Sequence, residues 1–300
     1  MDKLSTIKSK AGEIQSDHGS RGLELSIIIV DYKSSDFTID LLADLKKHLT
    51  NVKHEIIVVD NDPSGNAADV IAIRQSAERQ SNLNVIKAKK NLGFAAGNNL
   101  GAKEASGEYL LLLNPDIKIV DDSIEAMLDF ITKHTEVGAL SCLLYQPDAK
   151  TLQRHFFADF QSFAGIIFKR RQGRKALSFP RKREPTDNDF FYTDMVSGAA
   201  LMVKRKLFEE IDGFDQNFFM YIEDDDFCRR LQKLGYKNAV LTTARLIHYE
   251  GQSSTPFEKK QFYYKSQDYY WQKHYGSFQT ALMKIVRSPY ILWQKMKSRA

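Results

Sequence analysis

Apolar runs alternate with amphipathic stretches through the first half of the chain. The runs predict buried strands over residues 25–30, 56–59, 84–88 and 109–113. Between and after them, apolar positions with helical spacing predict helices over residues 41–49, 70–80, 95–105 and 124–131. Strands that alternate with helices predict an α/β fold with a mostly parallel sheet flanked by helices.

The second half predicts fewer regular elements. Apolar runs predict strands over residues 195–203 and 239–247, and a helix follows the acidic cluster Glu223–Asp226. Residues 278–300 mix apolar and basic positions, and Pro289 is expected to break this stretch into two pieces. The basic, proline-containing segment 169–189 is expected to be mobile.

Composition places the chain among soluble globular proteins, with 300 residues, 43% hydrophobic and 27% charged. The net charge of +5 is concentrated in residues 169–175, in 181–183 and near the C-terminus, where it could attract phosphate or anionic lipid or simply be solvated. Cys142 and Cys228 each lie within an apolar pattern, and both are expected to be free thiols. Residues 1–22 have no signal-peptide core, and no apolar run has membrane-spanning length, so a cytoplasmic protein, or one at the inner membrane surface, is expected.

Carboxylates follow several predicted strands. Asp31, Asp60 and Asp116 each come directly or shortly after a strand, and in such sheets ligands bind beyond the carboxyl ends of the strands. A carboxylate there suits a divalent cation shared with a substrate phosphate. A carboxylate from the cluster Glu223–Asp226 could then act as a general base. For the acidic cluster Asn114–Asp116 alone, or for Glu223–Asp226 alone, a solvated or helix-capping role is an equal alternative.

Short motifs along the chain add a family resemblance. They are Ser26–Ser34, Val58–Asp62, Asn91–Asn99, Leu112–Asp116, Ser197–Leu201, Gly213–Asp224 and His248–Ser253. In this order they resemble family-two glycosyltransferases of the GT-A fold, particularly the bacterial rhamnosyltransferase-like group. The resemblance implies a GT-A-type domain over residues 23–276, between a polar extension at 1–22 and an amphipathic basic tail at 277–300.

The resemblance also implies a nucleotide-diphosphate sugar donor and a metal, Mg²⁺ or Mn²⁺. Asp116 and His248 are the implied metal ligands, although a lone histidine is as often structural. Asn114 replaces the first acid of the usual Asp-x-Asp signature, and Asp31 stands where relatives commonly carry asparagine. The implied donor-binding residues are Asp31, Asp60, Asn91, Gly93, Phe94, Gly97, Asn98 and Asn114.

The same resemblance implies inversion at the anomeric centre by direct attack. Asp224 is the expected base, beside Glu223 as the other catalytic carboxylate. Glu223 and Asp225 remain alternatives for the base, whereas Asp226 and Arg230 are expected to support the helix as a cap and an ion pair.

The implied reaction is transfer of rhamnose from dTDP-rhamnose to a glycan or polyprenyl-linked acceptor in cell-surface polysaccharide synthesis. Alternatives are a UDP-sugar donor, a nucleotidyltransferase or a non-catalytic nucleotide-sugar-binding module. The C-terminal stretch suits a membrane interface, packing on the domain or an oligomer contact equally well. The aromatic run 262–271 could stack on sugars or form core, and no nucleic-acid partner is expected.

Overall fold

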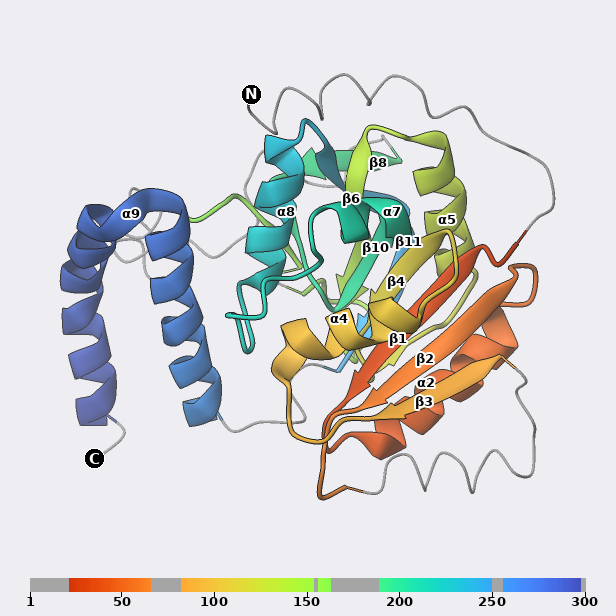
Figure 1. Cartoon of the computed structure of the whole chain (residues 1–300), viewed down its shortest axis with the longest axis horizontal. Helices are drawn as coiled ribbons and strands as arrows, with labels where there is room; N and C mark the ends of the chain where they lie inside the picture. The colour runs from red at the N-terminus through yellow and green to blue at the C-terminus, as the bar shows by residue number, and fades with distance from the viewer. Residues whose placement is uncertain (1–21, 66–81, 154–155, 163–188, 250–255, 298–300) are drawn as a thin grey trace.

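The computed structural model describes residues 22–65, 82–153, 156–162, 189–249 and 256–297. Within these residues the chain forms one large sheet with helices on both faces, and a C-terminal helical hairpin stands to one side (Figure 1). The helix expected over residues 70–80 and residues 169–188 of the expected mobile segment lie outside the described residues.

The first strands confirm the predicted parallel arrangement. β1 (Leu25–Asp31) pairs in parallel with β2 (His54–Asp60) on one side and with β4 (Tyr109–Leu113) on the other. β3 (Leu83–Lys87) extends the sheet in parallel beyond β2. Both faces of β1 and β4 are buried, as their continuous apolar runs predict.

The second half makes the sheet mixed. β10 (Ala200–Lys204) lies antiparallel between β4 and β6 (Val137–Tyr145), and β6 pairs in parallel with β11 (Lys237–His248). The short strands β5 (Ile117–Lys118) and β8 (Phe190–Thr193) pair antiparallel with β11. The strand predicted over residues 195–203 is in fact two strands, because β9 (Met195–Val196) pairs with β7 (Phe157–Ala158) in a separate small sheet.

Helices cover both faces of this sheet. α2 (Ser35–His48) lies behind β1 and β2, and α4 (Gly93–Glu104) lies in front of them (Figure 1). Three more helices pack against the strands β6, β10 and β11. They are α5 (Ser123–Lys133), α7 (Arg205–Glu210) and α8 (Glu223–Lys233). α4 packs closely because Gly97 and Gly101 face β1: a Cβ at these positions would lie 2.8 Å from Val30 Cγ1 and 2.5 Å from Ile28 Cγ2.

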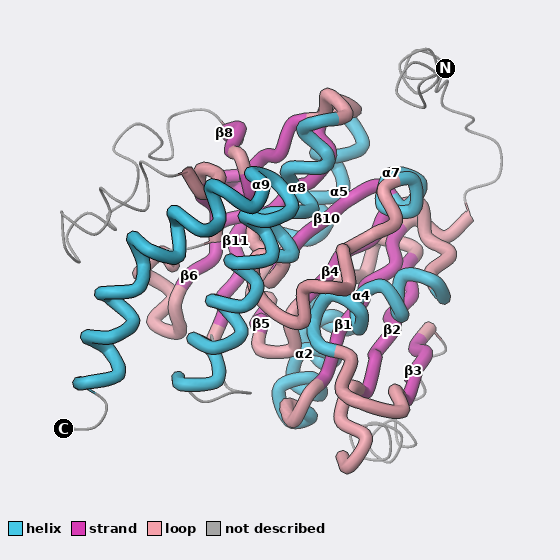
Figure 2. The backbone as a smooth tube through the Cα atoms, turned by 60° about the vertical axis from the view of Figure 1, so that its left-hand side comes forward, coloured by secondary structure: helices cyan, strands magenta, loops and turns pink. Residues whose placement is uncertain are grey.

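The C-terminal element α9 (Pro256–Lys297) is two helices joined at Gly276, whose φ is +84°. The predicted break at Pro289 is wrong: the helix runs through Pro289, and the chain turns at the one residue without a Cβ to oppose this φ. The first half lies beside α8 and the second half lies outside the first (Figures 1 and 2). Arg287 locks the halves together by donating to Gln267 Oε1 at 2.8 Å and to Asp268 Oδ1 at 2.6 Å.

Among the described residues, no helix has the length and apolar character needed to cross a membrane. Cys142 and Cys228 are both buried free thiols, as predicted.

Candidate active site

The strand-end carboxylates lie at one edge of the sheet. Asp31 and Asp60 end the neighbouring strands β1 and β2 and are in register. Both are fully buried, and Asp116 follows the adjacent strand β4. The Asp31 carboxylate accepts hydrogen bonds from Thr38 Oγ1 and from Ser34 N, so it also holds the start of α2. Burial, reinforced by the charge of Asp60, raises the pKa of Asp31.

Asn61 attaches the end of β2 to the segment expected to bind the donor. Its Nδ2 donates to Asn91 Oδ1 and to the Gly93 carbonyl, each at 3.2 Å, and its Oδ1 accepts from Leu92 N at 2.9 Å. The Gly93 amide donates to Asn91 Oδ1 at 2.9 Å. This loop is therefore fixed from the sheet by side-chain amides.

The start of α4 also contacts the loop before α8. Phe94 N donates to the Phe219 carbonyl at 2.8 Å, and a Cβ at position 93 would lie 2.2 Å from that carbonyl oxygen. Gly93, with φ +77°, therefore cannot be replaced without displacing this loop. Gly97 faces the sheet and Asn98 Nδ2 donates to Phe94 O at 2.9 Å, so the structure gives both residues a packing role, and their donor contacts stay predictions.

His248 and Asp116 face one another at the end of β11. Their Nε2 and Oδ1 atoms are 3.2 Å apart. Gln153 fixes the ring: its Nε2 donates to the His248 carbonyl at 2.8 Å, which turns its Oε1 toward His248 Nδ1 at 2.9 Å. With the Nδ1 proton donated to Gln153, Nε2 presents a lone pair to the Asp116 carboxylate. The Asn114 amide nitrogen lies 3.4 Å from the same Nε2.

This pair fits a divalent cation. Two lone pairs at that separation repel unless a second proton or a cation lies between them, and adjacent ligands of one Mg²⁺ with bonds near 2.1 Å are about 3 Å apart. A histidine whose other nitrogen is held by a hydrogen-bond acceptor is the usual arrangement of a metal ligand. Among the described residues no group of three or more His, Cys, Asp or Glu side chains could hold a metal, so the remaining ligands would be phosphate and water.

Asp224 lies in the first turn of α8. Its Oδ2 accepts from Gly198 N and its Oδ1 from Asp225 N, each at 3.0 Å. The side chain is half-buried, and burial raises the pKa of Asp224. A carboxylate that stays reachable and has a raised pKa suits general-base catalysis.

Glu223 is in a different environment from Asp224. It is 5% exposed, and its Oε2 has no hydrogen-bond partner within the described part of the chain. Burial, and then the charge of Asp224, raise the pKa of Glu223 well above its ordinary value. The Glu223 side chain is therefore favoured in its neutral form, which can donate a hydrogen bond but cannot accept a proton.

Both carboxylate oxygens of Asp226 form ion pairs with neighbouring basic side chains. Arg230 Nε lies 2.8 Å from its Oδ2, and Lys273 Nζ and His274 Nε2 each lie 2.7 Å from its Oδ1. Burial would raise the pKa of Asp226, but the hydrogen bond from His274 and the charges of Arg230 and Lys273 outweigh it and lower the pKa. The expected ion pair with Arg230 is confirmed, and Asp226 also joins α8 to α9.

The segment between β9 and β10 connects the two ends of the site. Gly198 N holds Asp224, and the next residue, Ala199, accepts a hydrogen bond at its carbonyl from Asn114 N at 2.9 Å. A Cβ at position 198 would lie 3.0 Å from the Phe94 ring and 3.8 Å from Asp224 Cβ. One short segment therefore sets the position of the carboxylate at α8 relative to Asn114 and Asp116.

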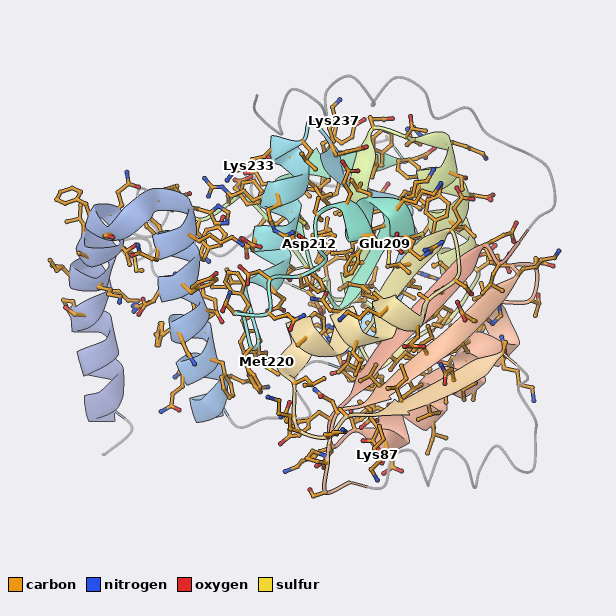
Figure 3. The ribbon with its side chains drawn as sticks, in the orientation of Figure 1. Lys87, Glu209, Asp212, Met220, Lys233 and Lys237 are labelled. Carbon is orange, nitrogen blue, oxygen red and sulfur yellow. The ribbon has the colours of Figure 1, made fainter. Side chains whose placement is uncertain are left out.

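The turn before α8 has an unusual backbone. Tyr221 and Ile222 have φ values of +68° and +70°, a conformation that a β-branched residue rarely adopts. Ile222 is held by a small hydrophobic cluster with Phe218, Tyr270, Trp271 and Met283. In addition, Ser266 Oγ donates to the Met220 carbonyl at 2.8 Å. Both halves of α9 thus hold the turn that presents the acids, and Figure 3 places Met220 at that end of α8.

Gln153, Asn61 and Gly198 were not predicted as site residues. Asn61 and Gly198 lie within motifs quoted from the sequence, and Asn61 directly follows a strand-end carboxylate. Gln153 had no sequence signal, because it lies 95 positions from His248.

Comparison with known proteins identifies the family of the chain. The family described as "Glycosyl transferase family 2" matches residues 26–212, and "N-terminal domain of galactosyltransferase" matches residues 179–252. Rhamnosyltransferase WbbL of Escherichia coli (strain K12) is 26% identical over 243 residues, which are 79% of this chain and 87% of WbbL. An N-acetylglucosaminyl-diphospho-decaprenol L-rhamnosyltransferase of Mycobacterium tuberculosis is 26% identical over 60% of this chain, which spans 62% of that relative.

Solved structures agree on the fold. GalNAc-T7, crystallised with UDP, GalNAc and Mn²⁺, has a TM-score of 0.60 at 13% identity, over 89% of this chain and 55% of that one. Staphylococcus aureus TarS 1-349 in complex with UDP has a TM-score of 0.52 at 18% identity, over 75% of this chain and 60% of that one. The expected GT-A-type fold is confirmed, and of the function classes left open by the sequence, the glycosyltransferase is the one supported. The chain belongs to glycosyl transferase family 2, as an enzyme that uses nucleotide-sugars in polysaccharide synthesis.

Proposed function

We propose that this glycosyltransferase moves L-rhamnose from dTDP-rhamnose to a glycan or polyprenyl-linked acceptor, with inversion and with help from Mg²⁺ or Mn²⁺. The observation that carries the proposal is the bridge at Gly198 and Ala199, which positions a carboxylate of raised pKa relative to a pair able to hold a cation. Two relatives at 26% identity are named rhamnosyltransferases, and these names support the choice of sugar.

The reaction follows from the positions of these side chains. The acceptor hydroxyl oxygen attacks the anomeric carbon while the bond from that carbon to the diphosphate oxygen breaks. Asp224 takes the hydroxyl proton, and the nucleoside diphosphate leaves. Asp116 and His248 would hold the cation, which neutralises charge on a departing diphosphate. Glu223, favoured as a neutral acid, would donate a hydrogen bond within the site.

A UDP-sugar donor is the second candidate. The similar structures of GalNAc-T7 and TarS both contain UDP, and the fold they share with this chain is the support for this alternative. Measurement of donor hydrolysis and transfer with dTDP-rhamnose and with a panel of UDP-sugars separates the two.

The decisive experiment compares Asp224→Asn with Asp225→Asn. The first should keep donor affinity within a few fold and lower single-turnover transfer about 10²–10⁴-fold, the usual contribution of a general base. Asp225→Asn is the matched control on the same turn and should cost less. Normal transfer by Asp224→Asn would refute the assignment of the base, and release of pyrophosphate instead of nucleoside diphosphate would refute glycosyl transfer.

We also propose that α9 contacts an anionic membrane surface. Phe278 and Ile285 on its second half are 81% and 68% exposed, and Leu282 between them is 38% exposed. Lys284 pairs with Asp268, but its side chain is still 51% exposed. An exposed apolar stripe with a basic side chain near it suits a membrane interface, and the mycobacterial relative is named for a polyprenyl-linked substrate.

A further inference from the structure

The aromatic residues of α9 separate into two groups in the structure. Tyr270 and Trp271 are core residues, with 0% and 1% of their surface exposed. Tyr263, on the same helix, is 40% exposed. The sequence pattern gave the same two alternatives, sugar stacking or core, for all of these residues. The exposed fraction separates them and leaves Tyr263 as the candidate for sugar stacking.

Tyr263 is exposed on the face of the helix that is turned toward the domain. Residues three, four and seven positions later share its face, and these are Ser266, Gln267 and Tyr270, which are 4%, 6% and 0% exposed. Since helical side chains lean toward the N-terminus, the ring of Tyr263 extends past the last packed turn. Part of the Tyr263 surface therefore stays accessible, while the next turns of the same face are covered.

The face of α9 that carries Tyr263 contacts the turn before the acids of α8. Ser266, one turn further along this face, donates from its Oγ to the Met220 carbonyl at 2.8 Å, three residues before Glu223. Phe262, its neighbour, packs its ring 4.9 Å from the Phe219 ring, and the Phe219 carbonyl holds the start of α4. Burial raises the pKa of Tyr263, and the charges of Asp225 and, more weakly, of Asp224 raise it further. A partly exposed aromatic ring thus lies on the helix face that contacts the turn leading into Glu223 and Asp224.

We propose that the ring of Tyr263 is the platform on which the acceptor sugar lies when Asp224 takes its proton. This inference rests on the proposed glycosyl transfer and adds the acceptor side of the site. A sugar has an apolar C–H face and a hydroxyl edge, so it needs an aromatic surface on one side and carboxylates on the other. Tyr263 and the acids of α8 supply both, from elements about forty residues apart in the chain.

Binding of simple glycosides tests the platform without depending on turnover. Ligand-observed NMR would measure methyl glycosides of rhamnose, N-acetylglucosamine, glucose and galactose in the presence of dTDP and Mg²⁺. At least one glycoside should bind the wild-type chain, Tyr263→Ala should weaken it roughly tenfold, and Tyr263→Trp should retain it. dTDP affinity should be the same in all variants.

Tyr192→Ala is the matched control, because Tyr192 is 37% exposed. Its ring lies 4.4 Å from Lys237 Nζ, and Lys237 is at the opposite end of α8 from Met220 (Figure 3). Glycoside binding that is equal in wild type and Tyr263→Ala overturns the inference, as does a wild-type chain that binds none of the glycosides. Absence of transfer in a chain that does bind them refutes the proposed function instead.

Discussion

Gln153→Leu should weaken metal-dependent nucleotide binding. The substitution removes the acceptor 2.9 Å from His248 Nδ1 and the donor 2.8 Å from the His248 carbonyl, in a place where Gln153 is 6% and His248 is 8% exposed. Loss of such a partner of a metal ligand typically costs 10–100-fold in metal affinity, or about 1.4–2.8 kcal/mol. Calorimetric titration of Mn²⁺ into the chain with saturating dTDP or UDP measures the change directly.

Gln153→Glu is the matched variant. A carboxylate can still accept the Nδ1 proton, although it cannot donate to the His248 carbonyl, so Mn²⁺ affinity should fall clearly less than in Gln153→Leu. Because Gln153→Leu also leaves buried polar groups of His248 unpaired, unfolding should be followed in parallel and the titration run well below the transition. Equal Mn²⁺ affinity in the leucine variant and wild type would refute both the orientation of His248 and its role as a ligand.

Three further variants test the acidic helix and the hairpin. Asp226→Asn removes the buried carboxylate that pairs with Arg230 and His274, while Lys273 keeps Asp215. It should cost about 3 kcal/mol in urea unfolding, with donor affinity retained, and a change below about 1 kcal/mol would contradict the network. The raised pKa of Glu223 makes the folded state bind its proton more tightly, so this contribution to stability is complete below the unfolded pKa and is lost as pH rises through the folded pKa. Glu223→Gln should therefore lose less stability than wild type between pH 5 and 8 in thermal unfolding, and parallel pH profiles would exclude the neutral acid. Phe278→Ser combined with Ile285→Ser should lower binding to anionic vesicles with unchanged thermal stability, and equal sedimentation with vesicles would reject membrane contact.

Substitution of Phe278 and Ile285 tests membrane contact more cleanly than removal of the C-terminal stretch. Met283 is fully buried against the turn before α8, and Arg287 joins the two halves of α9. Removal of residues 278–300 would therefore disturb the acids as well as the exposed stripe, and loss of vesicle binding could not be separated from damage to the site.

The parallel half of the fold could be predicted because each strand is a separate apolar run bounded by polar residues. β6 was missed, although it lies inside the sheet between β10 and β11. Its run from Val137 to Tyr145 directly follows α5 after a short turn, and apolar periodicity alone does not separate a buried strand from a helix. The break between β9 and β10 at Ser197–Ala199 was also missed. β9 ends at Val196, which pairs with Phe157, and a local apolar pattern does not show a contact between residues so far apart in the sequence.

Strand-end carboxylates and the acidic helix start were visible in the sequence because local pattern places them. Which acid is open, neutral or ion-paired was not visible, because contacts from distant segments decide it. Asp226 is occupied by Lys273 and His274, and Asp224 is oriented by Gly198. Likewise, burial of Tyr270 and exposure of Tyr263 depend on where α9 docks, which a helical pattern does not specify.

The left-handed turn at Tyr221 and Ile222 limits how relatives could exchange acceptor specificity. If the hairpin carries the acceptor platform while the sheet carries the donor residues, swapping C-terminal helices is the simplest evolutionary route to a new acceptor. Each residue in such a backbone conformation costs about 1–3 kcal/mol, which here the packing of Met283 and Trp271 on Ile222 offsets. An imported hairpin without matching side chains would let the turn relax and turn Asp224 away from the sugar. Residues 218–222 and the hairpin are therefore expected to be inherited together, as one recombining unit separate from the donor half.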